Sequence, residues 1–290
     1  MEVLSALVPL TIKIGLDPEL FEIGGLSITW HGLFTAVGVV AGVWVSAILG
    51  RRAGIAEDTI YNMALALVIG GIIGARTLYV LENLDLFGDD PLEVFAINTG
   101  GISIYGALIG GTLGASAYAA WRRLPRWGMM ADIAAIGAIL GMAVGRIGDI
   151  INGEHFARIT DWPIGVLYTN PNSPSYPFFT NQPPLAQHPA VAYELVGDLI
   201  IFVLLLLVAR RVFKRDGMVF LAWAFLYSAM RFGISFLRND EIVALGLRMA
   251  QLIALAIMIA TPVAVAFLLT RRPPARAEKR RLAREEVSQE

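Results

Sequence analysis

Long apolar segments constrain this chain more than any other feature of its sequence. Seven segments reach the roughly 20 apolar residues that a helix needs to cross a bilayer. They lie near residues 28–49, 59–81, 102–121, 129–148, 189–210, 217–237 and 244–270. Charged residues make up only 16% of the 290 residues, well below the roughly 25% that is usual for soluble domains. We therefore predict an all-α polytopic membrane protein with seven transmembrane helices.

Basic residues follow alternate predicted spans and so indicate the orientation. Sixteen of the 23 Lys and Arg residues fall on one side of the membrane. They are Arg51, Arg52, Arg122, Arg123, Arg126, Arg210, Arg211, Lys214, Arg215, Arg271, Arg272, Arg276, Lys279, Arg280, Arg281 and Arg284. The positive-inside rule makes that side cytoplasmic, with the N-terminus outside and the C-terminus in the cytoplasm.

The predicted domain organisation is simple. Residues 1–270 are expected to form a single transmembrane domain, and 271–290 a basic cytoplasmic tail attracted to anionic lipid. The polar, proline-rich stretch of about 150–188 predicts an extracytoplasmic head or lid. Met1 to Ile14 is apolar but has neither a basic n-region nor a small-residue cleavage site, so a cleaved signal peptide is not expected.

Glycines recur at every fourth position in three spans and predict close helix packing. The three ridges are Gly70/Gly74, Gly106/Gly110/Gly114 and Gly137/Gly141/Gly145. They indicate packing and say nothing about activity.

The end of the fourth span carries the densest group of polar residues. It reads Gly145-Arg-Ile-Gly-Asp-Ile-Ile-Asn-Gly-Glu-His. A strong cation and two carboxylates at a membrane edge are costly, which suggests a site for a charged lipid headgroup. The alternative is that Arg146 and Asp149, three residues apart, only pair with each other on one helix face.

Polar side chains from five other spans lie at a similar predicted depth. With the orientation given above, these groups fall within roughly 10 Å of one level near the outer surface. They are His31, Arg76, Tyr105, Arg146, Asp149, Glu194 and Arg231. The shared depth predicts one site facing the outer leaflet. Separate interpretations remain for three of them, since Arg76 could extend to the headgroups and His31 and Tyr105 could be interfacial residues.

These residues lie in blocks that resemble the prolipoprotein diacylglyceryl transferase family. The stretch from Gly145 to Glu154 resembles the family signature G-R-x-G-N-F-x-N-x-E. Weaker blocks agree in order and spacing over about residues 25–260. They are Ile28-Thr-Trp-His-Gly-Leu, Gly74-Ala-Arg-Thr-Leu-Tyr, Gly100-Gly-Ile-Ser-Ile-Tyr-Gly, His188-Pro-Ala-Val-Ala-Tyr-Glu, Arg231-Phe-Gly-Ile-Ser-Phe-Leu-Arg and Arg248-Met-Ala-Gln-Leu.

The resemblance implies transfer of the diacylglyceryl group of phosphatidylglycerol to the lipobox cysteine of preprolipoproteins, with release of glycerol phosphate. The chain has no cysteine, which fits a thiol supplied by the substrate. No cofactor, metal or nucleic acid is implied, and the expected location is the bacterial cytoplasmic membrane. The expected catalytic residues are Arg146, Arg231, His31 and Tyr105. The expected substrate-binding residues are Arg146, Asn152, Gly153, Glu154, Asp149, Arg76 and Glu194.

Several positions depart from the family pattern. His31 stands where Tyr is usual, and Tyr105 where His is common, so we expect the two rings to face one cavity with His31 as the base. Asp149 replaces the Asn of the signature, and an added carboxylate repels an anion unless it is paired or protonated.

Two rival functions remain. One is a related protein, non-catalytic or with a changed substrate, that binds an anionic phospholipid. The other is a transporter, which predicts polar groups on both sides of the midplane or an inverted repeat. The cytoplasmic halves of the spans read as wholly apolar, and this disfavours the transporter.

Overall fold

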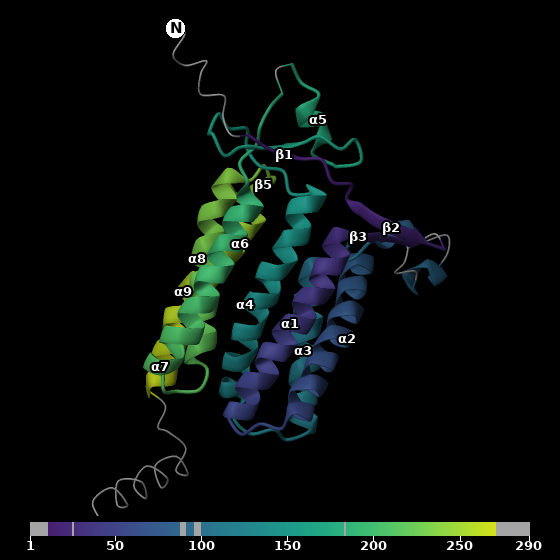
Figure 1. Cartoon of the computed structure of the whole chain (residues 1–290). Coiled ribbons are helices and arrows are strands. Elements are labelled where there is room, and N and C mark those ends of the chain that lie inside the picture. The colour runs from purple at the N-terminus through teal and green to yellow at the C-terminus, as the bar shows by residue number, and fades with distance from the viewer. Residues whose placement is uncertain (1–10, 25, 88–90, 96–99, 183, 271–290) are drawn as a thin grey trace, which may run out of the picture.

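A computed structural model describes residues 11–24, 26–87, 91–95, 100–182 and 184–270 (Figure 1). The predicted tail 271–290 lies outside these residues. The fold is mostly helical, with short strands gathered at one end of the bundle. The long helices are α1 (Trp30–Arg52), α2 (Glu57–Glu82), α3 (Ile104–Trp121), α4 (Trp127–Asn152), α6 (Ala190–Leu204), α8 (Met218–Ile234) and α9 (Met249–Thr270).

Six helical segments in the described part of the chain are long and apolar enough to cross a membrane. Two of them include an irregular last turn, because the π-helix η4 (Leu205–Ala209) extends α6 and the 3-10 helix η5 (Ser235–Leu237) extends α8. The short α7 (Arg210–Val212) follows η4. The multi-pass membrane architecture thus agrees with the prediction. Helix α3 coincides with the remaining predicted span but falls outside the group of six, since its 18 residues include Gly, Ser and Thr.

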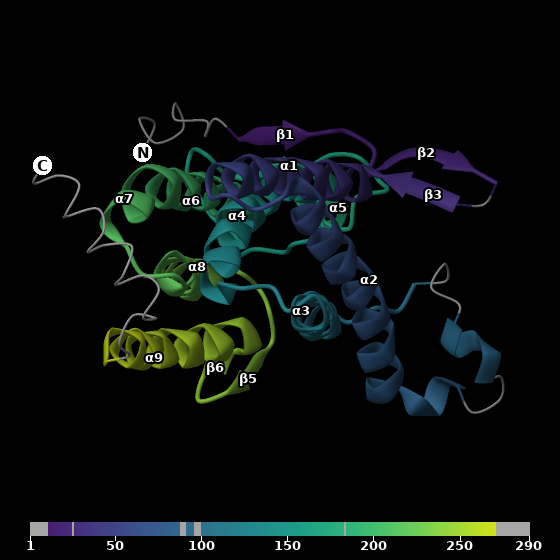
Figure 2. The same cartoon turned by 90° about the horizontal axis from the view of Figure 1, so that it is seen from below.

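Glycines join the helices into two close pairs, α1 with α4 and α2 with α3 (Figure 2). A Cβ placed at Gly137 would lie 2.4 Å from the Gly42 carbonyl oxygen. In the second pair, a Cβ at Gly110 would lie 2.2 Å from the Gly70 oxygen. No side chain fits at such distances, so the predicted packing role of the ridges is confirmed. Gly145 is the exception, because a Cβ there meets nothing within 4 Å.

The apolar core fills the half of the bundle that lies away from the strands. It forms where α4 meets α6, η4 and α8, around buried residues such as Ile136, Ile139 and Leu205. Asp132 lies in this half and accepts hydrogen bonds from the backbone of Gly217 and Phe220 at 2.8 Å each. The prediction of wholly apolar cytoplasmic halves is therefore wrong at Asp132, which caps the start of α8.

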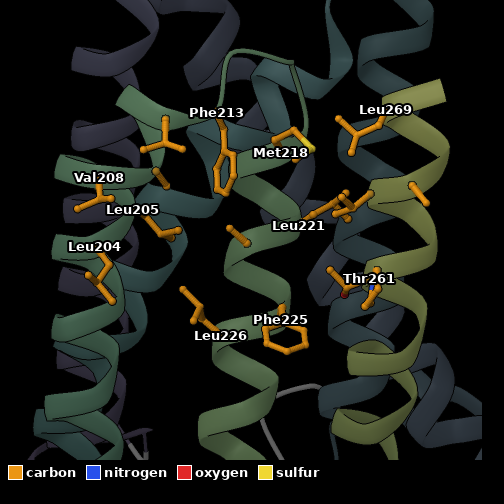
Figure 3. A pocket seen from close by; sticks show the side chains of 16 residues that line it. Leu204, Leu205, Val208, Phe213, Met218, Leu221, Phe225, Leu226, Thr261 and Leu269 are labelled. Atoms are coloured by element: carbon orange, nitrogen blue, oxygen red, sulfur yellow. The ribbon is translucent and has the colours of Figure 1, made fainter. Parts of the chain in front are cut away.

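An apolar groove opens between η4, α8 and α9 in the same half (Figure 3). Its labelled lining residues include Leu205, Phe213, Met218 and Phe225. Thr261 also lines it, but its hydroxyl donates to the carbonyl oxygen of Ile257 at 2.7 Å, within its own helix. The groove therefore offers no ionisable group for chemistry.

Three pairs of short strands and one short helix build a cap over the other end of the bundle. Strand β1 (Ile12–Ile14) pairs in parallel with β4 (Val166–Tyr168), and Ile12 lies opposite Val166. Strands β2 (Glu19–Ile23) and β3 (Leu26–Thr29) form one hairpin, and β5 (Ile242–Ala244) and β6 (Leu247–Arg248) form another. The short helix α5 (Tyr176–Phe179) lies above them. The stretch predicted as a head therefore forms only part of the cap.

The predicted spans differ from the observed helices mainly where they meet the cap. Residues 28 and 29 belong to β3, and 244–248 belong to the second hairpin. Helix α4 runs on to Asn152, beyond its predicted end at 148. The two short 3-10 helices between α2 and α3, η1 (Leu84–Phe87) and η2 (Pro91–Phe95), form an arm at the cap end of α2.

Candidate active site

The cap end of α4 carries Arg146, Asp149 and Asn152 on one helix face, because successive intervals of three residues keep side chains together. The helix stops at Gly153, whose φ of 70° is the left-handed conformation that favours glycine. The Gly153 carbonyl accepts from the Ser175 hydroxyl at 2.7 Å, and the Ile150 carbonyl accepts from Tyr168 at 2.9 Å. The cap thus holds the end of α4 in place.

Tyr168 stays a hydrogen-bond donor over a wide pH range. It lies in β4, where burial raises the pKa of its phenol to about 12, and the charge of Asp149 contributes further. The neutral phenol can therefore keep its bond to the α4 terminus.

Arg146 lies between carboxylates from two helices. Its Nη1 donates to Oδ2 of Asp149 at 2.9 Å, and its Nη2 lies 3.0 Å from Oε2 of Glu194. Its Nε lies 3.9 Å from Asp198, too far for a hydrogen bond. Simple pairing of Arg146 with Asp149 is therefore only part of the arrangement, because α6 supplies a second carboxylate that forms an ion pair with it.

Glu194 is fully buried and links three arginines. Its Oε1 accepts from Nη1 of Arg231 on α8 and lies 3.5 Å from Nη1 of Arg238. Its Oε2 faces Arg146. Arg238 also contacts Asp240, with Nε 3.0 Å from Oδ2. The carboxylate of Glu194 thus lies close to guanidinium groups from α4, α8 and the segment after η5.

Both histidines at the site approach Asp149. His31, in the first turn of α1, places Nδ1 2.5 Å from Oδ1 of Asp149. His155 places Nε2 3.5 Å from Oδ2, and its Nδ1 lies 3.2 Å from Nη2 of Arg238. Asp149 is therefore surrounded by one arginine and two imidazoles, so the added carboxylate of this chain is not an isolated negative charge.

Asn152 connects the signature to α1. Its Oδ1 accepts from the backbone N–H of His31 at 3.3 Å, and its amide donates to Oε1 of Glu154 at 2.7 Å. Asn152 is buried, whereas Glu154 is exposed. The two residues form the rim of the cluster beside His31.

Arg76 and Tyr105 do not join this cluster. The buried Arg76 donates to four backbone carbonyls, those of Glu93 and Val94 in the arm and of Gly100 and Gly101 before α3. Its guanidinium carbon also lies 5.3 Å from the centroid of the Phe87 ring. Tyr105 lies on α3 and is 38% exposed. Among the described residues, no hydrogen bond or ring contact joins it to His31 or Asp149, so the expected shared cavity has no support in these interactions.

The structure adds members that the sequence analysis did not select, and each left a signal. Arg238 is the second arginine of the Arg231 block, and the turn at η5 brings it back to Glu194. Asp198 follows Glu194 by one helical turn on the same face, and both of its oxygens are buried without a hydrogen bond to any described residue. An acidic residue inside an apolar segment is itself a signal.

The described residues contain no group of three His, Cys, Asp or Glu side chains that could hold a metal ion. The arginines of the site can bind anions, and its histidines and carboxylates can transfer protons.

Comparison with known proteins places these contacts in context. A family model described as prolipoprotein diacylglyceryl transferase matches residues 18–267. A phosphatidylglycerol–prolipoprotein diacylglyceryl transferase of Trichormus variabilis is 35% identical over 266 residues, which cover 89% of this chain and 91% of the relative. Proteins of the same name are 33% identical in Dehalococcoides mccartyi, over 84% of this chain and 90% of the relative, and in Clostridioides difficile, over 87% and 96%.

Proposed function

Because the chain belongs to the prolipoprotein diacylglyceryl transferase family, we propose that it transfers the diacylglyceryl group of phosphatidylglycerol to the lipobox cysteine of preprolipoproteins. The sulfur attacks the glyceryl carbon that carries the phosphate, the carbon–oxygen bond breaks, and glycerol phosphate leaves. The phosphate gains negative charge in this step, so the site must stabilise an anion.

The observation that carries the proposal is the pair of guanidinium groups held by Glu194. Arg146 and Arg231 come from α4 and α8, and each is anchored to one oxygen of the same buried carboxylate. None of the described residues accepts a hydrogen bond from Nε or Nη2 of Arg231, and its side chain is 19% exposed. These donors remain for phosphate oxygens, which match the fork of a guanidinium.

The other predicted substrate-binding residues take supporting positions around this pair. Asn152 and Glu154, with Gly153 between them, lie at the rim, where they suit the glycerol hydroxyls. Asp149 and Glu194 orient the arginines. The contacts of Arg76 favour a different role, support of the arm through four carbonyl groups.

We further propose that α3 is the seventh span and that the cap lies outside the cytoplasm. Arg51, Arg122 and Lys214 lie at the opposite end of the bundle from the cap, which supports a cytoplasmic location for that end. Residues 1–270 then form one membrane domain, with 271–290 as a cytoplasmic tail.

The test is transfer of labelled glycerolipid from phosphatidylglycerol vesicles to a lipobox peptide. The parent chain should transfer the label, and Arg146→Ala should lose roughly 100- to 1,000-fold in rate, the usual effect of removing one oxyanion donor. Arg126→Ala is the matched control, since Arg126 pairs with Asp216 at the opposite end of the bundle, with 2.7 Å between Nη2 and Oδ1. A parent that binds the lipid without transferring it would instead indicate the non-catalytic relative.

A further inference from the structure

Two polar side chains beside the arginine cluster, those of His31 and Asp149, are in direct contact. They come from different helices, α1 and α4, yet Nδ1 of His31 lies 2.5 Å from Oδ1 of Asp149. The contact joins the first turn of α1 to the cap end of α4.

The backbone around this contact holds the start of α1, and with it the imidazole of His31, against α4. A Cβ at Gly148 would lie 2.7 Å from Cα of His31, so only glycine lets the start of α1 approach so closely. The Thr29 hydroxyl caps α1 by accepting from Gly32 N at 3.1 Å, and Asn152 accepts from His31 N. The ring is therefore placed by its own helix start as well as by Asp149.

The contact also determines which ring nitrogen can take a proton. An ionised carboxylate only accepts, so the neutral imidazole donates through Nδ1 and keeps its lone pair on Nε2. None of the described residues bonds to Nε2, and the side chain is 45% exposed. The partly exposed ring lies at the rim of the arginine cluster.

The other two histidines of the chain are arranged differently. His155 faces Arg238 through Nδ1 and Asp149 through Nε2, so both of its ring nitrogens are engaged. His188 lies away from the cluster, and its Nδ1 is buried without a hydrogen bond to any described residue. Its ring centroid lies 6.2 Å from that of Trp162. His31 is thus the histidine with a partly exposed ring and, among the described residues, an unbonded acceptor beside the phosphate-binding arginines.

We propose that His31 is the general base that takes the proton of the lipobox thiol, with Asp149 as the positioning residue that orients its ring. The inference rests on the proposed transferase function. The S–H proton moves to Nε2 of His31, the thiolate forms the sulfur–carbon bond, and the electron pair of the broken carbon–oxygen bond stays on the leaving phosphate. The imidazolium then passes its proton to that phosphate or to water.

The first experiment compares pH profiles of the labelled transfer reaction. Besides Asp149, the charged groups around His31 are Arg146 and Glu154. The parent rate should rise through the range in which imidazole loses its proton and then level off. His31→Ala should lower kcat roughly 100-fold and abolish that rise, since positioned bases contribute about 100- to 10,000-fold. Added imidazole should restore at least about tenfold of the rate, because the ring site is partly open.

His155→Gln is the matched control for the profile. It removes the other imidazole near Asp149 and should lower the rate less while leaving the pH-dependent rise in place. A loss of the rise in His155→Gln, or its survival in His31→Ala, would assign the proton to another group and overturn the proposal.

The second experiment tests the pair as a unit. Asp149→Asn should lower kcat roughly tenfold and respond weakly to imidazole, because the ring of His31 remains but loses its orientation. The double variant His31→Ala with Asp149→Asn should lose no more rate than His31→Ala alone, because Asp149 acts through the ring that His31→Ala removes. Purely additive losses would overturn the coupling.

Failure of the parent can be distinguished from failure of this inference. If the parent transfers no label, the proposed function itself fails. If the parent transfers label and His31→Ala matches it, only the assignment of the base fails. Thermal midpoints in detergent, measured for each variant, identify losses that come from misfolding.

Discussion

The α1–α4 and α2–α3 pairs are built alike but hold their buried arginines differently. Each pair packs through glycine backbones, and each has a buried or nearly buried arginine toward the cap end. Arg76, on α2, is bound by four backbone carbonyls. Arg146, on α4, is bound by side-chain carboxylates from two helices and has an Nε without a hydrogen bond.

The difference separates an arginine that supports structure from one that can bind a ligand. Carbonyls of the chain itself are fixed acceptors, and four of them leave Arg76 little capacity for a further anion. Carboxylate side chains can rotate, so a phosphate can enter beside Arg146 without unfolding the backbone. The predicted depth of the two residues is similar, and their partners distinguish them.

The largest expected effect tests the guanidinium fork of Arg146. Arg146→Lys keeps the charge but loses the forked geometry, and we expect transfer to fall by roughly 100-fold or more. Measured kcat and KM for phosphatidylglycerol should show that most of the loss is in kcat. Activity within threefold of the parent would mean that charge alone is sufficient at this position.

The next effect concerns the buried carboxylate that links the arginines. Glu194→Gln removes the charge that Arg146 and Arg231 share, and breaking a buried pair costs about 3–5 kcal/mol. We expect a lower thermal midpoint in detergent and roughly tenfold less transfer. Glu57→Gln is the control, because Glu57 pairs with Arg51 at 2.8 Å in a more exposed setting and should change neither quantity measurably.

A smaller effect should distinguish the glycines of the two pairs. Gly42→Ala adds a Cβ 2.6 Å from the Gly137 oxygen, so it should shift α1 along α4 and lower transfer about fivefold. Gly110→Ala disturbs α2 and α3 equally but should lower mainly the thermal midpoint. Gly145→Ala, with open space at its Cβ, should keep the midpoint of the parent. Equal losses of transfer in the first two variants would remove the functional difference between the pairs.

The smallest effect on activity is expected at Arg76. Arg76→Lys cannot reach all four carbonyls, so the arm after α2 should open more often. Limited proteolysis should cut η2 faster, while transfer falls only about twofold. A loss as large as that of Arg146→Lys would return Arg76 to the substrate site.

The sequence analysis predicted those site residues that place a charged or titratable side chain within an apolar segment. Arg146, Asp149, Glu194, Arg231 and His31 shared one predicted depth, and the structure brings them together. Depth does not report lateral position, so Arg76 and Tyr105 were grouped with them although they lie on the other pair. Asp198 was missed because it lies one turn deeper than Glu194.

The helices were predictable and the cap was not. Twenty apolar residues have few alternatives in a bilayer, so the predicted spans match the observed helices to within five residues. The cap strands are two to five residues long, and although β2–β3 and β5–β6 are local hairpins, β1 pairs with β4 across a long stretch of sequence. The positions of the strands depend on the helices next to them. The three residues Ile12–Ile14 contain no pattern that would predict pairing with β4.

The parallel pairing of β1 with β4 sets an order of events during synthesis. Ile12 emerges from the ribosome long before its partner Val166, because α1 to α4 lie between them in the sequence. Strand β1 therefore has no β4 to pair with until α4 and the segment after it have been synthesised. A bulky fusion before residue 11 should therefore disturb the end of α4, because the same cap donates hydrogen bonds to Gly153 and Ile150.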